Sequence, residues 1–393
     1  MKITKEKLKI VLEKTIGKVT FSIFSIFRLQ DKVVFSNFNG KKYDDNPRYI
    51  SEKLHQDDPN VKIVWIEHKG FKINPPSYVK VVQWPALEMF FQLATAKIWV
   101  DSHSKPLYVC KRKGQFFVET WHGGLGMKKI EGDAIERLSQ SYIETSKHSV
   151  SMADVFISNS DWLNAIYRRA FNYKGKIIKC GYPKNDIFFS NKKETIYVKV
   201  REKLGLPLKQ KILLYAPTFR EKYGTDKWLD INLSQLEKYL NKSENTSWTI
   251  LVKMHPKMLC CKEVYKKILN DNILDVTGYP DMQELIIATD MFITDYSSAI
   301  FDFSLLSRPA FIYASDYAIY EESERGLYFE LNELPFPITH DMKDLLDAIC
   351  NFDKICYREK LKSFFDRVGM YESGCAAETV ARLIMEKLKE SGK

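Results

Sequence analysis

The sequence lacks the cysteine pattern of a disulfide framework or of a zinc site. Its seven cysteines are an odd number in a chain of 393 residues, and their spacings are not those of metal ligands. Cys260 and Cys261 are adjacent, which is poor geometry for binding one zinc ion together. No signal-peptide cleavage site follows the N-terminus. We therefore expect reduced thiols in the cytosol and no disulfide.

Long apolar runs are also missing. The longest uncharged apolar run near the start, Val19–Phe27, has nine residues, whereas a helix needs about 20 to cross a bilayer. Just before it, one face of an expected helix is apolar and is edged by lysines. The apolar residues are Leu8, Val11, Leu12, Ile16 and Val19, and the lysines are Lys7, Lys14 and Lys18. Two interpretations stay open: a basic segment that binds an anionic membrane surface, or a helix packed on the protein's own body.

The positive charge lacks the pattern of a nucleic-acid-binding protein. The net charge is +10, and residues 1–30 carry seven Lys or Arg against two Glu, a net charge of +5. The remainder is spread along the chain without a basic stripe, a zinc-finger motif or an RNP-like motif. We expect no nucleic-acid partner but phosphate substrates near an anionic surface. No Asp-x-Asp pair suits a metal–nucleotide site, so we expect no tightly bound metal and no cofactor.

What the sequence has is a regular alternation of short apolar runs and helical patterns, which predicts a parallel sheet in each half of the chain. The length favours two domains. The predicted strands of the first half are Lys32–Ser36, Val61–Glu67, Val79–Gln83, Ile98–Ser102, Phe116–Thr120, Val155–Ser158 and Ile177–Cys180. Those of the second half are Lys211–Ala216, Thr249–Met254, Ile273–Val276, Met291–Thr294 and Ala310–Tyr313.

The expected fold class is α/β and GT-B-like, with two doubly wound βαβ domains facing a cleft and a C-terminal helical tail. A segment rich in Lys, Glu and Asn, Ser190–Gln210, marks the expected boundary. We expect a basic amphipathic membrane-associating segment at 1–30, an N-terminal α/β domain at 31–195, a second α/β domain at 205–375 and a C-terminal helix at 376–393. The family resemblance described below implies that the first domain is on the acceptor side and that the second binds the donor substrate.

Five loops place polar or small residues directly after predicted strands, where doubly wound sheets bind their ligands. They are Thr120–Gly124, Gly181–Asp186, Tyr215–Arg220, Lys253–Pro256 and Thr294–Ala299. In the first loop, glycines follow His122 and leave room for a ligand, and a histidine can accept a proton near neutral pH. A loop histidine that only packs is the alternative. The second loop has the composition of a turn in any case.

The last three loops suit phosphate binding. Thr218 and Arg220 place a hydroxyl and a guanidinium two residues apart, although an ordinary turn with a solvated arginine fits the same letters. Pro256 ends a strand and fixes the direction of His255. Thr294–Ala299 joins a strand to a helix, so its N–H and hydroxyl groups can bind an anion at a helix N-terminus. A serine that merely caps that helix is equally compatible.

Taken in order, these motifs resemble the CDP-glycerol glycerophosphotransferase family, which contains teichoic acid primases and polymerases. The resemblance covers roughly residues 115–335, and Tyr371–Glu378 looks like the closing helix of the family. Lys184 and Lys253 stand where the family usually has Arg, and both changes lose bidentate geometry. Residues 124–128 replace the family's usual Thr-Pro-Leu-Lys, a difference that concerns the acceptor. The first 110 residues match only loosely.

The resemblance implies an enzyme that transfers glycerol phosphate or ribitol phosphate from CDP-glycerol or CDP-ribitol to a lipid-linked saccharide or polyol-phosphate acceptor, releasing CMP. It implies two catalytic residues, with His122 as general base and His255 as the partner of the diphosphate. The implied substrate-binding residues are Trp121, Gly123, Asn185, Asp186, Thr218, Arg220, Pro256, Thr294, Asp295, Ser297, Ser298 and Arg325. We expect a peripheral protein on the cytoplasmic face of a bacterial cell membrane, active in cell wall biogenesis, and leave open whether it forms a homo-oligomer.

Two alternatives stay open at this point. A GT-B glycosyltransferase that uses a nucleotide sugar would share the fold and the phosphate site at a helix N-terminus. A non-catalytic membrane-associated binding protein would share the fold alone, and the presence of both His122 and His255 argues against it. The choice between glycerol and ribitol, and between priming and polymerising, is open as well.

Overall fold

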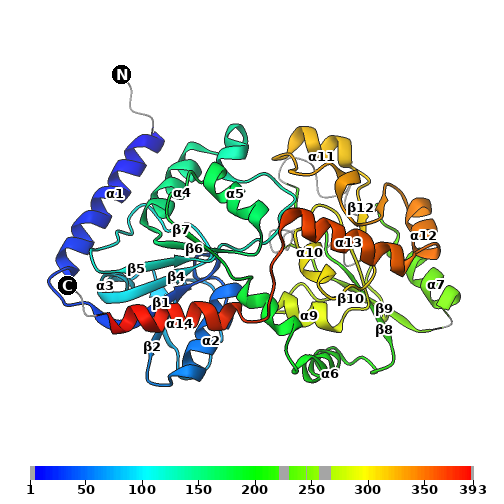
Figure 1. The fold of residues 1–393 in the computed structure, drawn as a ribbon, viewed down its shortest axis with the longest axis horizontal. Helices are drawn as coiled ribbons and strands as arrows, with labels where there is room; N and C mark the ends of the chain where they lie inside the picture. The colour runs from blue at the N-terminus through cyan, green and yellow to red at the C-terminus, as the bar shows by residue number, and fades with distance from the viewer. Residues whose placement is uncertain (1–4, 221–229, 245, 256–266, 391–393) are drawn as a thin grey trace. The chain divides into compact units, whose positions relative to one another are not determined.

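The computed structural model describes residues 5–220, 230–244, 246–255 and 267–390. The chain forms two compact units, each built on its own parallel sheet (Figure 1). Unit 1 comprises residues 1–124, 131–186 and 371–393, and unit 2 comprises residues 125–130 and 187–370. The predicted α/β class and the two parallel sheets are therefore confirmed.

Unit 1 contains a seven-stranded parallel sheet in the order β3-β2-β1-β4-β5-β6-β7. The central strands are buried along nearly their whole length, as expected where both faces of a parallel sheet are covered. The strands are β1 (Gln30–Ser36), β2 (Lys62–His68), β3 (Lys80–Trp84), β4 (Ala96–Asp101), β5 (Phe116–Glu119), β6 (Val155–Ser158) and β7 (Lys176–Lys179). The α-helices are α1 (Lys5–Phe24), α2 (Asp45–Asp57), α3 (Leu87–Thr95), α4 (Gln140–Met152), α5 (Asp161–Ala170) and α14 (Ala376–Lys389).

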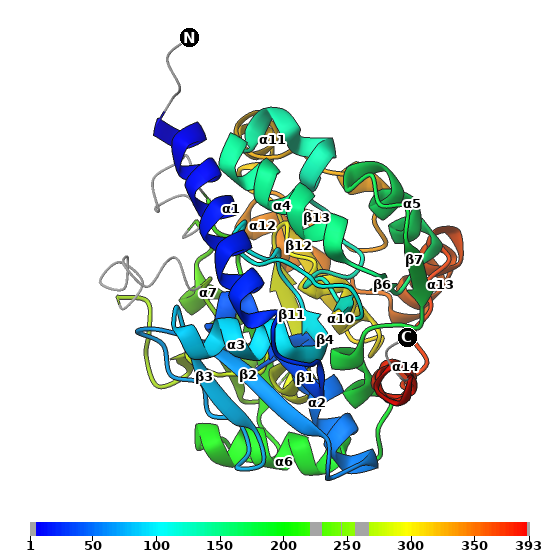
Figure 2. The same ribbon diagram turned by 90° about the vertical axis from the view of Figure 1, so that its left-hand side faces the viewer.

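Helix α1 packs on unit 1 with one face and exposes apolar side chains on another. Phe21 is buried and makes edge contacts with Phe90 and Trp99, and Figure 2 shows α1 running beside α3. Gly17 permits this approach, because a Cβ there would lie 2.2 Å from the carbonyl oxygen of Tyr108. The exposed apolar residues of α1 are Val11, Leu12, Ile16, Val19 and Ile23. Among the described residues, no helix is long and apolar enough to cross a bilayer.

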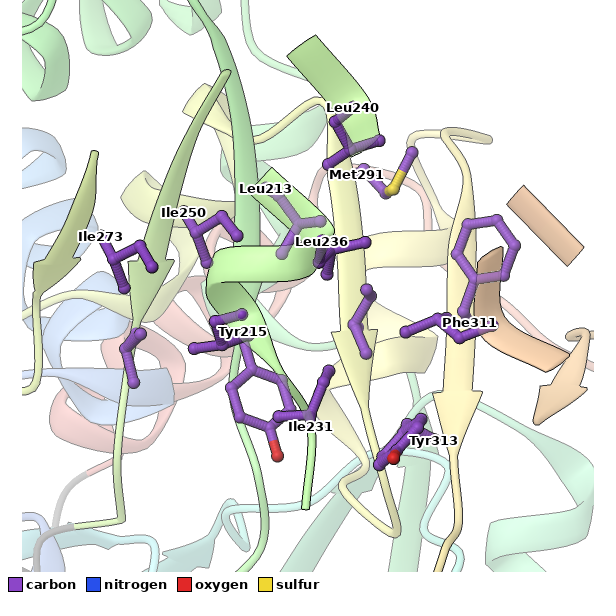
Figure 3. Packing of buried hydrophobic residues seen from close by; sticks show 14 of the residues in the cluster. Leu213, Tyr215, Ile231, Leu236, Leu240, Ile250, Ile273, Met291, Phe311 and Tyr313 are labelled. Atoms are coloured by element: carbon purple, nitrogen blue, oxygen red, sulfur yellow. The ribbon is translucent and has the colours of Figure 1, made fainter. Parts of the chain in front are cut away.

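Unit 2 contains a six-stranded parallel sheet in the order β10-β9-β8-β11-β12-β13. Figure 3 shows its core, in which side chains from β8 to β12 pack against Leu236 and Leu240 of α7. The strands are β8 (Lys211–Tyr215), β9 (Trp248–Val252), β10 (Ile273–Asp275), β11 (Met291–Thr294), β12 (Ala310–Tyr313) and β13 (Ile338–Thr339). The α-helices are α6 (Lys193–Leu204), α7 (Leu233–Glu244), α9 (Met282–Ala288), α10 (Ala299–Ser304), α11 (Tyr317–Ser323), α12 (Met342–Cys350) and α13 (Lys354–Val368).

The two units divide the chain differently from the expected domains. The charged segment that was expected to link them contains α6, which packs on α9 and buries Val200 and Arg201. Because α6 buries only one narrow face, most of its residues are polar or charged. The sequence alone does not distinguish this composition from that of a linker. Residues 371–393 belong to unit 1 and residues 125–130 to unit 2. The sequence also predicts a helix over Cys260–Asn270, and most of that segment lies outside the described residues.

The C-terminal segment is fastened to unit 1 by the loop after β7. Asp186 accepts hydrogen bonds from the backbone N–H groups of Ala376 and Ala377, at 3.0 and 2.7 Å, and so caps the start of α14. Asn185 donates to the carboxylate of Glu372 at 3.0 Å. Burial raises the pKa of Asp186 to about 6 although both N–H groups lower it. These contacts give Asn185 and Asp186, both expected to bind substrate, a structural role.

The cap predicts a loss of stability. Replacing Asp186 with Ala removes the acceptor of two backbone N–H groups at a helix start, and losing a helix cap costs about 0.5–2 kcal/mol of unfolding free energy. Urea unfolding followed by far-UV circular dichroism measures the change. Asp161→Ala is the matched control. Asp161 is an acidic residue in the first turn of α5, but the side chain that caps this helix is that of Ser160. Equal stability of the two variants would contradict the capping role.

Candidate active site

His122 lies in the loop after β5 and is held by the loop after the neighbouring strand β4. Its Nδ1 lies 3.1 Å from the carbonyl oxygen of Ser102, which can only accept a hydrogen bond. Nδ1 therefore carries the proton, and in the neutral ring Nε2 carries the lone pair. The His122 ring stacks on the ring of His103, with 4.2 Å between the ring centroids, and its centroid lies 4.3 Å from that of the Trp121 ring. The geometry gives His122 a fixed tautomer and a fixed ring plane.

Buried polar groups fix the backbone on which His122 sits. Trp121 has a φ of 54°, in the left-handed region that a tryptophan rarely adopts. Its N–H donates to Glu119 at 2.9 Å, and its carbonyl accepts from the amide of Asn46 at 3.1 Å. Burial, together with the charge of Asp101, raises the pKa of Glu119 well above its usual range. The conformation before His122 thus depends on a carboxyl group that the fold has taken out of water.

The two glycines after His122 differ in their surroundings. A Cβ added to Gly123 would be no closer than 3.8 Å to another atom outside its chain neighbours, in ordinary contact with the ring of Trp121. A Cβ added to Gly124 would lie 3.0 Å from the side-chain nitrogen of Asn159, which would have to shift to admit it. Gly123 therefore leaves more space than Gly124, beside the ring of Trp121.

Asp295, directly after β11, organises the corresponding region of unit 2. Its carboxylate accepts hydrogen bonds from the backbone N–H of Thr218, at 2.9 and 3.0 Å, and from that of Tyr296 at 2.6 Å. It also pairs with Arg220 at 2.9 Å. Thr218 and Arg220 follow β8, the strand beside β11. One buried carboxylate therefore ties together the loops after two adjacent strands.

Arg220 is committed to protein carboxylates, contrary to the expected phosphate grip. It is 7% exposed, donates to Asp316 at 2.8 and 3.1 Å, and pairs with Asp295 as well. Burial alone would lower the pKa of Arg220, but the charges of these two acids raise it. For Asp316, burial acts to raise the pKa, and the hydrogen bond and charge of Arg220 lower it below its usual value. We therefore assign Arg220 and Asp295 to the framework of the site.

The residues around the start of α10 have mixed roles. The hydroxyl of Thr294 donates to the carbonyl of Ala216 at 2.6 Å, which makes Thr294 a link between β11 and the loop after β8. The hydroxyl of Ser297 accepts a hydrogen bond from the N–H of Ala299 at 3.3 Å. This is the kind of bond expected of a serine that caps the start of the helix. Ser298 is half-buried and makes no side-chain cap bond to the helix.

The remaining expected residues of unit 2 are more exposed. His255 is exposed, and its ring stacks on that of Phe219 at 5.7 Å. Arg325 is half-buried and lies close enough to Lys128 for its charge to affect that group. Pro256 lies outside the described residues. Within the described ranges, no group of three or more His, Cys, Asp or Glu side chains could hold a metal ion.

Three residues in these regions were not singled out by the sequence reasoning. His103 stacks on His122, and burial lowers its pKa well below the usual value, so its ring is neutral. Asp316 accepts a hydrogen bond from Arg220, and Lys128 belongs to unit 2 although it follows the His122 loop in the sequence. His103 and Asp316 each follow a predicted strand within three residues, so the rule that found the five loops could have found them too.

The fold and these two regions define a class, the two-domain α/β transferases of the GT-B-like type. The family model of CDP-glycerol:poly(glycerophosphate) glycerophosphotransferases matches residues 20–386. The chain therefore belongs to that family. The predicted family, the GT-B-like fold and the expected class of enzyme, a transferase, are confirmed.

Named relatives cover the chain over nearly its whole length. It is 31% identical over 389 residues to a teichoic acid poly(glycerol phosphate) polymerase of Staphylococcus epidermidis, covering 93% of this chain but only 53% of the relative. It is 29% identical over 397 residues to a teichoic acid glycerol-phosphate transferase of Staphylococcus aureus, covering 96% of this chain and 100% of the relative. A crystallised histidine variant of the wall teichoic acid polymerase TagF, soaked with CDPG, is similar at a TM-score of 0.84, 28% identity and 98% coverage of both chains.

The Arg220 cluster predicts a large loss of stability when the cation is removed. Arg220→Met leaves the carboxylates of Asp295 and Asp316 buried without their cationic partner. Removing one partner of a buried ion pair lowers the free energy of unfolding by about 3–5 kcal/mol. The wild type keeps this contribution above about pH 4 and loses it as the pH falls through the lowered pKa of Asp316.

Arg169→Met is the matched control for this variant. Arg169 makes the same two-nitrogen pairing with Asp133, but its side chain is 59% exposed. Exposed pairs contribute about 0–1 kcal/mol, so this variant should unfold at nearly the wild-type urea concentration. If Arg220→Met were as mild as the control, the cluster would not be a framework element.

Proposed function

We propose that this protein transfers glycerol phosphate or ribitol phosphate from a CDP-polyol to a lipid-linked acceptor, as a step in building teichoic acid or a similar polymer. The observation that carries the proposal is the fixed His122 ring in a chain that matches the glycerophosphotransferase family over residues 20–386. A soak of the similar TagF structure with CDPG supports a CDP-polyol as the donor.

In the proposed reaction His122 acts as the general base. The acceptor hydroxyl gives its proton to Nε2, and the oxygen attacks the phosphorus that carries the polyol. The bond from that phosphorus to the CMP oxygen breaks, and CMP leaves. Such a displacement needs positioning and charge neutralisation rather than a covalent enzyme intermediate. The hydrogen bond from Nδ1 to Ser102 supports the assignment, because it keeps the lone pair on the other nitrogen.

We base the other assignments on the family resemblance and on the contacts described for each residue. We assign donor binding to unit 2, through His255, Ser298 and Arg325, with Ser297 contributing while it caps α10. We assign the acceptor to unit 1, beside Trp121 and Gly123. Arg220, Asp295, Thr294, Asn185 and Asp186 hold the loops in place.

We further propose that α1 binds an anionic membrane surface with its exposed apolar face. Ile16 and Ile23 are 48% and 56% exposed and lie two turns apart on the same face of α1. Basic residues near an anionic surface contribute about 1 kcal/mol each, and an amphipathic helix adds apolar burial. A lipid-linked acceptor would then be reached from the membrane surface, which we propose is the cytoplasmic face.

The base assignment predicts that His122 matters for turnover and not for donor affinity. A positioned base contributes about 10²–10⁴-fold, so His122→Ala should lower the rate of CMP release by that order. The dissociation constant for CDP-glycerol, measured by calorimetry, should change little. His255→Ala should damage both quantities, because its proposed partner is the diphosphate.

A matched control for this experiment is His340→Ala. His340 also places Nδ1 near a backbone carbonyl, that of Ala314 at 3.1 Å, and it is not part of the proposed site. Its turnover should equal that of the wild type. Near-normal turnover of His122→Ala at saturating acceptor would show that another group takes the proton.

The membrane proposal predicts that charge on the outer face of α1 abolishes binding to vesicles. Deleting the segment would expose the pocket of Phe21, so the test is the double variant Ile16→Glu with Ile23→Glu. It should remain in the unbound fraction of a flotation assay with vesicles rich in anionic phospholipid. The control is Leu208→Glu with Ile355→Glu, two residues that are 56% and 72% exposed in unit 2. Equal binding of both double variants would refute the role of α1.

A further inference from the structure

Residues 125–130 follow the His122 loop in the sequence but are part of unit 2. Lys128 forms an antiparallel bridge with Leu327. The N–H of Lys129 donates to the carbonyl of Gly326 at 3.0 Å, and the N–H of Tyr328 donates to the carbonyl of Met127 at 2.7 Å. This short pairing fixes the backbone direction of Lys128 beside the segment that carries Arg325.

The ammonium group of Lys128 lies at the Asp295–Arg220 cluster. Its Nζ is 5.7 Å from the ring centre of Tyr320, the same ring over which Arg220 lies at 4.8 Å. Burial lowers the pKa of Lys128 to about 8, with Asp295 and Glu324 acting in the opposite direction. Lys128 is thus a cation at the carboxyl ends of β8 and β11, where parallel sheets bind their ligands.

Lys128 has no dedicated anionic partner among the described residues. The carboxylate of Asp295 is already engaged by Arg220 and by two backbone N–H groups. Within the described part of the chain, no carboxylate lies within ion-pair distance of Lys128, whose recorded close contact is the Tyr320 ring. A half-buried ammonium group without a close counter-ion is costly. An anionic ligand would remove that cost.

A second polar group at the same place also lacks a partner. The hydroxyl oxygen of Thr218 is buried and makes no hydrogen bond to any described residue, and Thr218 as a whole is 8% exposed. Its backbone N–H donates to Asp295, and the charge of Asp295 also acts on Lys128, so Thr218 and Lys128 both lie near the same carboxylate. Buried hydroxyl groups are almost always hydrogen-bonded, so an orphan one marks a place where a ligand is expected.

We propose that Lys128 and the Thr218 hydroxyl bind a phosphate oxygen of the donor diphosphate. This inference rests on the proposed function. It adds Lys128, which is supplied by the stretch that directly follows His122, and it gives Thr218, already implied by the family resemblance, a specific ligand atom. An ammonium group and a hydroxyl are the donors that a diphosphate oxygen accepts from, and charge-assisted bonds of this kind are the strong ones. Arg220 stays in the framework, bound to its two acids.

Calorimetry with CDP-glycerol tests this proposal on the full chain. Wild-type protein is titrated first, because a failure to bind CDP-glycerol would refute the proposed function itself, whatever Lys128 does. Given binding, Lys128→Met should raise the dissociation constant about ten- to a hundred-fold, the loss expected for a hydrogen bond to a charged group. Methionine keeps the apolar stem against Tyr320, so the thermal unfolding midpoint should stay within a few degrees of the wild type.

Lys129→Met is the matched control. Lys129 is the next residue of the same short pairing, and its side chain runs over Gly326 instead of toward Tyr320. Its dissociation constant should equal that of the wild type. Thr218→Val, which removes only the hydroxyl, should weaken binding in the same direction as Lys128→Met. Wild-type affinity in both Lys128→Met and Thr218→Val would overturn the proposal, and a loss in Lys129→Met as large as in Lys128→Met would overturn it too.

Discussion

The buried carboxylate of Asp295 is the group on which the arrangement of unit 2 depends. It joins the loops after β8 and β11 through two backbone N–H groups and Arg220, and Arg220 extends the connection to Asp316 after β12. Because charges out of water require close partners, this cluster admits one arrangement of the three loops. The groups that remain for a ligand, among them Ser298 and the orphan hydroxyl of Thr218, therefore have fixed positions.

Unit 1 uses buried polar groups in a comparable way to position His122. Glu119 and Asn46 hold the backbone of Trp121 in a left-handed conformation, and the Ser102 carbonyl selects the tautomer of the next residue. Backbone in such a region is costly and is kept only where its surroundings enforce it, often at functional sites. The neutral ring of His103 then sets the plane of the His122 ring. These contacts fix the orientation of the His122 ring from within unit 1.

Strands and terminal helices could be predicted closely, whereas the roles of single polar residues could not. Val155–Ser158, Met291–Thr294 and Ala310–Tyr313 are found at their predicted bounds, and α14 begins at the predicted residue, Ala376. Fully buried strands leave a continuous apolar run in the sequence. Arg220 was expected to bind phosphate. The sequence could not reveal its structural role, because its partner Asp316 lies 96 positions away and leaves no local signal. The same holds for Asp186, whose partners are 190 and 191 positions away.

The central claim is that the donor is a CDP-polyol and that its phosphorus receives the acceptor oxygen. The most direct test is to incubate the full chain with a lipid-linked acceptor and, in separate reactions, CDP-glycerol, CDP-ribitol or a UDP-sugar, and to measure the nucleotide released. The account predicts acceptor-dependent release of CMP from at least one CDP-polyol, with the lipid product gaining one polyol phosphate per CMP. Release of UDP from a UDP-sugar, with no CMP from either CDP-polyol, would contradict it.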